Sequence, residues 1–76
     1  MMRFFIRKEP SGFMWRLFGS NGSSIARSEG VYSTRPSCIR AVRNIVQKLG
    51  MGATLHVHGK RPFDTILPTG EIKGVA

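Results

Sequence analysis

The feature that most constrains this 76-residue chain is an almost continuously apolar run that leads into a hairpin signal. Between Gly12 and Phe18, five of the seven positions carry large apolar residues, and Arg16 lies among them. Asn21-Gly22 follows shortly afterwards, and this pair favours a tight hairpin because both residues tolerate positive φ. A strand that is covered on one face needs apolar residues only at alternate positions. The run therefore predicts a sheet whose two faces both require cover.

Two further strand-like runs flank this segment. The runs 2–8, 13–18 and 23–28 are separated by the turn Glu9-Pro10-Ser11-Gly12 and by Asn21-Gly22. Proline fixes φ in the first turn and glycine supplies its flexible corner. This order of strands and short turns predicts an antiparallel β-meander.

One helix is predicted to follow, because start and stop signals bracket an amphipathic segment. Ser33 or Thr34 can serve as the N-cap and Pro36 suits the first turn. Gly50 suits the C-cap after Leu49, and Lys48 lies favourably near the negative end of the helix dipole. The apolar positions have helical spacing and form one stripe. They are Cys38, Ile39, Val42, Ile45, Val46 and Leu49.

The last third of the chain predicts short strands. A fourth strand is expected over 53–58, a loop over 59–62 and a short fifth strand over 65–67, while 72–76 is expected to be an edge strand or a frayed end. The predicted fold class is α+β, with a three-stranded antiparallel β-meander packed by one α-helix, plus a C-terminal strand or hairpin. The length allows a single domain that spans 1–76.

Charge is the most unusual property of the composition. Twelve Lys and Arg residues against four Asp and Glu give a net charge of +8. Such charge attracts nucleic acid, an acidic protein or a membrane surface, although it can also serve solubility alone. No run approaches the ~20 apolar residues of a membrane helix, and we expect a cytoplasmic protein that is not bound to a membrane. The single cysteine, Cys38, falls on the apolar side of the helix, which favours a buried free thiol.

Several motifs resemble the YegP-like family of small bacterial domains of unknown function. They are a strand with "FFI", a glycine-containing turn, "WRLFGSNGSSIARSEGVYST" and a helix with "CIRAVRNIV". The family's short S-x-x-Y motif corresponds to Ser28–Tyr32, which is one residue longer, and "LHVHGKRPFDTI" is similar to the closing strand of related domains. The resemblance covers residues 3 to 48. It implies a helix-packed meander, association as repeats or dimers, no established catalytic residues, and a helix-facing position for Trp15 and Leu17.

With Trp15 and Leu17 facing the helix, the other residues of the meander can be assigned to its two faces. The side under the helix is expected to carry Phe4, Ile6, Phe13, Trp15, Leu17 and Ile25. The other side interleaves aromatic residues and methionine with arginines, and its members are Arg3, Phe5, Arg7, Met14, Arg16 and Phe18. Three interpretations are open: an interface between two copies of the chain, a platform for nucleic acid, or a face covered by the C-terminal segment. Pairing of two copies is the interpretation that the sequence favours.

The outer side of the helix is a second basic surface. It carries Arg35, Arg40, Arg43 and Lys48. A solvated helix face is the simpler interpretation. The functional alternative is contact with the phosphates of DNA or RNA, to which arginine is well suited.

Catalytic and metal chemistry have little support in the sequence. His56 and His58 alternate on a predicted strand, but a zinc site needs three or four ligands, so we interpret both as ordinary strand residues. The four acidic residues form no spaced pair, and the glycine pairs lack the strand-to-helix context of a phosphate loop. We therefore expect no enzyme, no cofactor and no metal.

The sequence thus predicts a small basic binding module without catalytic activity. We expect it to be dimeric and to engage nucleic acid or an acidic partner through its arginine-rich surfaces. The alternative is a protein-interaction or regulatory domain whose positive charge is incidental and which binds no nucleic acid.

Overall fold

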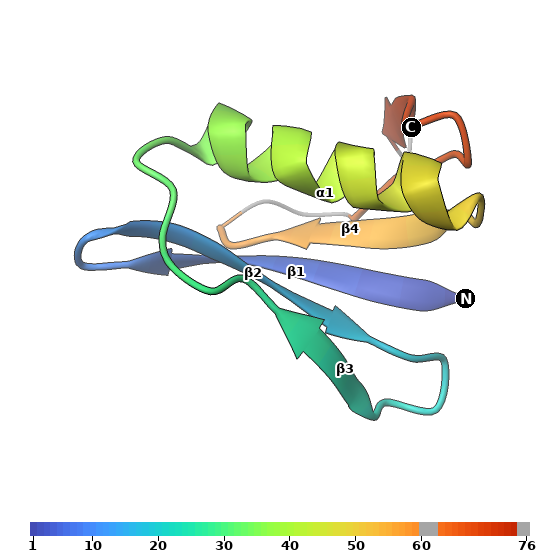
Figure 1. Ribbon diagram of the computed structural model, residues 1–76, viewed down its shortest axis with the longest axis horizontal. Coiled ribbons are helices and arrows are strands. Elements are labelled where there is room, and N and C mark those ends of the chain that lie inside the picture. Colours follow the sequence, from blue (N-terminus) through green and yellow to red (C-terminus); the bar gives the residue numbers. More distant parts are fainter. Residues whose placement is uncertain (60–62, 75–76) are drawn as a thin grey trace.

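A mixed sheet with one helix across it makes up the structure, a computed structural model that describes residues 1–59 and 63–74 (Figure 1). The elements are β1 (Met2–Glu9), β2 (Gly12–Phe18), β3 (Ser24–Arg27), α1 (Arg35–Leu49), β4 (Ala53–Val57), β5 (Asp64–Ile66) and β6 (Ile72–Gly74). The sheet has six strands in the order β3-β2-β1-β4-β5-β6. The predicted α+β class is confirmed, but the sheet has six strands rather than the three of the predicted meander.

The sheet is larger than predicted because the chain returns to it after the helix. β1 pairs with β2 in antiparallel fashion, and on its other edge it pairs with β4 in parallel. Parallel neighbours need a long crossover, and the segment that contains β2, β3 and α1 supplies it. β5 and β6 then add antiparallel strands beyond β4. The meander and the C-terminal strands therefore form one continuous sheet.

The helix begins and ends where the sequence predicts. The side chain of Thr34 accepts a hydrogen bond from the backbone N–H of Ser37 at 3.3 Å, as an N-cap does. Gly50 adopts the left-handed conformation with φ of 68°, and its N–H donates to the carbonyl of Val46 at 3.0 Å. Among the described residues, no helix is long and apolar enough to cross a membrane.

The core lies between α1 and one face of the sheet. The helix contributes Cys38, Val42 and Val46, which are all fully buried. The sheet contributes Phe4, Ile6, Trp15, Leu17, Ala53, Leu55, Val57 and Ile66. The predicted helix-facing positions of Phe4, Ile6, Trp15 and Leu17 are confirmed, and Phe13 packs half-buried against the same core.

Ile25 is the exception, because it does not lie under the helix. Its side chain remains 57% exposed. The register of β2 with β3 shifts between Leu17 and Phe18, so Ala26 pairs with Leu17 while Ile25 has no partner in the ladder. An extra residue in one strand removes the simple alternation on which the prediction relied.

The C-terminal strands lie toward the helix and do not cover the opposite face of the sheet. The turn between β5 and β6 is tied to α1 by two hydrogen bonds. Arg43 Nε donates to the carbonyl of Gly70 at 2.8 Å, and Gln47 Nε2 donates to the carbonyl of Thr69 at 2.5 Å. The interpretation in which the C-terminal segment covers the second face is therefore wrong for its described part. Residues 60–62 and 75–76 lie outside the described residues.

We expect Cys38 to be unreactive in the folded protein. Its side chain is fully buried, and burial raises the pKa of the thiol to about 11. The thiolate is the reactive form, so at pH 8 alkylation by iodoacetamide should be about two orders of magnitude slower than in the denatured chain. Mass spectrometry of samples labelled with and without urea measures the difference. Equal labelling rates would show that the core opens freely.

Candidate functional site

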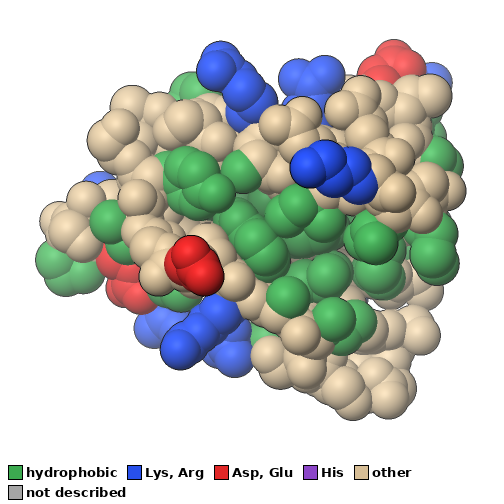
Figure 2. Space-filling model, in the orientation of Figure 1, with side chains coloured by type: hydrophobic (Ala, Val, Ile, Leu, Met, Phe, Trp, Pro, Cys, Tyr) green, Lys and Arg blue, Asp and Glu red, His purple; other side chains and the backbone are tan. Residues whose placement is uncertain are grey.

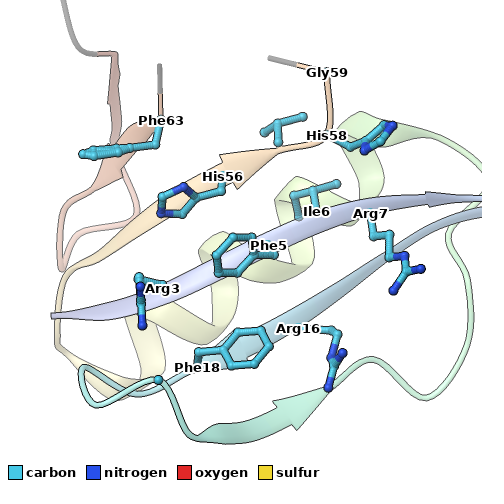
Figure 3. A pocket seen from close by; sticks show the side chains of 12 residues that line it. Arg3, Phe5, Ile6, Arg7, Arg16, Phe18, His56, His58, Gly59 and Phe63 are labelled. Carbon is cyan, nitrogen blue, oxygen red and sulfur yellow. The ribbon is translucent and has the colours of Figure 1, made fainter. Parts of the chain in front are cut away.

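The sheet face opposite α1, called the open face here, collects most of the residues predicted for it. Phe4 and Ile6 point into the core, so their neighbours on β1 point the other way. Five of the six predicted residues line one shallow depression on this face (Figure 3). They are Arg3, Phe5, Arg7, Arg16 and Phe18. Met14 instead lines a neighbouring hollow together with Arg27.

Four rings form a continuous row across the open face, and we call them the ring row. The ring centroids of Phe18 and Phe5 are 5.4 Å apart in an edge-on arrangement. Phe5 stacks on His56 at 4.6 Å with an interplanar angle of 15°. His56 meets Phe63 at 5.0 Å, again edge-on. The row thus passes from β2 across β1 and β4 to the residue before β5 (Figure 3).

His56 acts as an aromatic surface rather than as a charge. Burial lowers its pKa, and the neighbouring positive charge of Arg3 lowers it further. The imidazole is therefore neutral at pH 7, where it lies between two phenyl rings. Thr54 Oγ1 and His56 Nε2 are 3.0 Å apart and share a hydrogen bond, which holds the ring in place.

Sequence reasoning missed the roles of His56 and Phe63. His56 reaches the ring row because β4 pairs in parallel with β1, which makes it the partner of Phe5. The aromatic rings of the two residues were visible in the sequence, but the parallel pairing was not. His58 also lines the depression. No group of three or more metal-ligating side chains occurs within residues 1–59 and 63–74.

The depression is strongly cationic. Arg3, Arg7 and Arg16 line it, and no Asp or Glu does among the described residues. The guanidinium of Arg16 lies 5.1 Å from the ring centroid of Phe18, which is a cation–π contact. The volume of the depression is about 1350 Å³, which is more than the ~300–1000 Å³ of a small-molecule pocket. Its size and openness suit an extended anionic chain better than a small metabolite.

The basic residues predicted on the helix form no comparable site. Arg35 lies over the ring of Phe13 at 5.5 Å, and Arg43 is committed to the carbonyl of Gly70. Arg40 and Lys48 are exposed. Figure 2 shows Lys and Arg side chains both over the helix and at the opposite margin of the molecule, so positive charge is not confined to one surface.

Comparison with known proteins gives a family and no activity. The family model described as a domain of unknown function, DUF1508, matches residues 11–55. This match spans β2, β3 and α1, together with the beginning of β4. It covers more than half of the 76 residues. No curated protein and no solved structure matches the chain.

Proposed function

Because the chain belongs to the DUF1508 family of domains of unknown function, we propose a function from the chemistry of its own surface. It is a small binding module without catalytic activity, and its open face binds single-stranded nucleic acid. Within the family we place it among the YegP-like members, on the hairpin and helix motifs of its sequence.

The ring row flanked by arginines is the observation that carries this proposal. Every base has a π-face, so unpaired bases stack on exposed aromatic rings whatever their sequence. Phe5 is 36% exposed, although it stacks on His56 and meets Phe18. Arg3 and Arg7 lie two residues before and after it on β1, which places their Cα atoms roughly 7 Å to either side of that of Phe5. Rings for bases and guanidinium groups for phosphates thus share one surface.

A second copy of the chain is the main competing occupant of the open face. Burial of its apolar rings would favour pairing by ~1.5–3 kcal/mol for each fully buried side chain. Face-to-face pairing would also bring together the three arginines of each depression, and no carboxylate among the described lining residues offsets them. Like charges brought together in this way are costly. Charge complementarity therefore favours a polyanion over a second copy of the chain as the occupant of the open face.

A single strand fits the open face better than a duplex does. The bases of a duplex are already stacked inside the helix, so the rings would gain nothing from them. Single-stranded ligands splay their bases onto aromatic side chains and place their phosphates on basic groups. The ring row is therefore expected to discriminate between the two forms, whereas a merely basic surface binds both.

Fluorescence anisotropy tests the proposal with labelled 12-nucleotide oligouridine, oligothymidine and a duplex of equal length, at low and moderate salt. We expect the single strands to bind more tightly than the duplex. Phe5→Ala should weaken single-strand binding by about 5- to 150-fold, because stacking contributes ~1–3 kcal/mol per base. Arg40→Ala on the helix removes one positive charge from the other side of the sheet and should leave affinity nearly unchanged.

Four results would overturn the proposal. They are an absence of single-strand binding even at low salt, equal affinity for the duplex, an unaltered affinity of Phe5→Ala, and an equal loss in Arg40→Ala. Analytical ultracentrifugation of the unaltered protein and of Phe5→Ala measures the oligomeric state of each. If the protein is a dimer and Phe5→Ala converts it to a monomer, the open face is an interface between two copies of the chain, which is the interpretation that the sequence favours.

A further inference from the structure

We infer that the bound strand crosses the sheet at right angles to the β-strands, and that Arg16 and Arg27 together hold one of its phosphates at the β3 end of the ring row. This inference rests on the proposed function and specifies the path of the ligand on the same face.

Arg16 and Arg27 form an unusual pair. They are direct cross-strand partners on β2 and β3, so both side chains belong to the same face of the sheet. Two like charges placed directly opposite each other destabilise a sheet. An anion held between the two guanidinium groups would offset this repulsion through charge-assisted hydrogen bonds.

A phosphate diester matches the chemistry of this pair. Guanidinium groups bind phosphate oxygens through paired, charge-assisted hydrogen bonds. The cation–π contact with Phe18 already holds Arg16 against the sheet. All four residues of β3 are exposed, so the side chain of Arg27 is accessible from solvent. The site is therefore open to a ligand and partly organised in advance.

The register of the sheet places this phosphate site in line with the rings. Arg16 pairs with Arg27 on one side and with Phe5 on the other, and Phe5 pairs in turn with His56. One ladder therefore runs across β3, β2, β1 and β4, and Phe63 extends it. Along β1, by contrast, the open-face neighbours of Phe5 are the arginines Arg3 and Arg7. Only the direction across the strands offers successive rings for successive bases.

The same register sets the length of the site. Neighbouring strands lie about 4.8 Å apart, so the path from β3 to β5 spans roughly 19 Å. That distance accommodates about four to six nucleotides of a stacked or moderately extended single strand. Affinity should therefore rise with oligonucleotide length up to this size and then level off.

Salt titrations with oligouridine test the shared phosphate. Each phosphate contact on a single strand contributes about 0.7 to the slope of log K against log salt. Arg16→Ala and Arg27→Ala should each weaken binding but keep most of the slope, because the remaining arginine still contacts the phosphate, whereas the double variant should lose about 0.7 in total. Lys8→Ala is the matched control. It removes one charge from β1 at a position whose side chain lies over Phe13, away from the open face.

The outcomes separate this inference from the proposed function. A slope loss in the double variant of about twice that value would mean two independent phosphates, and an unaltered affinity of Arg27→Ala would remove Arg27 from the site. Either result, or affinity that still rises well beyond six nucleotides, overturns the inference while single-strand binding stands. If the unaltered protein fails to bind oligouridine at all, the proposed function itself fails.

Discussion

Phe4→Ala is expected to lower the free energy of unfolding by about 3–5 kcal/mol. Phe4 is fully buried, and its ring meets Trp15 edge-on at 5.8 Å in the centre of the core. Truncation removes a large apolar group and leaves a cavity that the packed helix can only partly fill. Small domains often have a total stability of only ~5–15 kcal/mol, so this variant should be close to unfolding.

Phe5→Ala is the matched control for this prediction, because it makes the same chemical change at the next residue of the same strand. Phe5 faces the open side and is 36% exposed, so its loss should cost only about 1 kcal/mol. Urea denaturation followed by the fluorescence of Trp15, the single tryptophan, measures both variants. Equal destabilisation by the two changes would mean that both faces of the sheet are buried in the folded state.

Gly12→Ala is expected to destabilise the fold by about 2–4 kcal/mol. Gly12 has φ of +154°, and a Cβ atom there would lie 2.3 Å from the carbonyl oxygen of Tyr32. This contact is with backbone, so rotation of a side chain cannot relieve it. The same carbonyl accepts a hydrogen bond from the N–H of Phe13 at 2.8 Å, and Tyr32 N–H donates to Phe13 at 2.7 Å. The alanine would therefore push apart the bridge between β2 and the segment that leads into the helix.

Gly30→Ala supplies the control, because an added Cβ atom at Gly30 meets nothing within 4 Å. Its effect on stability should be within ~0.5 kcal/mol of zero, as for most surface substitutions. Thermal or urea unfolding of both variants checks the contrast. A Gly12→Ala protein as stable as the original would show that the bridge between Phe13 and Tyr32 does not constrain the fold.

The helix and the meander could be predicted because their signals are local. The N-cap at Thr34, the C-cap at Gly50 and the Asn21-Gly22 turn act within a few residues of the chain. Alternation along β1 and β2, oriented by the family resemblance, then separated the core side from the arginine-bearing side. The prediction that Ile25 faces the helix was wrong because a shift in strand register breaks the alternation.

By itself, the sequence determined the α+β class and the helix limits, and five of the six residues that it predicted for the open face do line the depression. The tertiary structure alone decided that β4 lies beside β1, which stacks His56 on Phe5 and brings Phe63 to the same row. It also placed Arg27 opposite Arg16 and committed Arg43 to Gly70. Pairing between strands that are distant in the chain depends on how the whole sheet packs over its core, so it cannot be predicted from any short segment of the sequence.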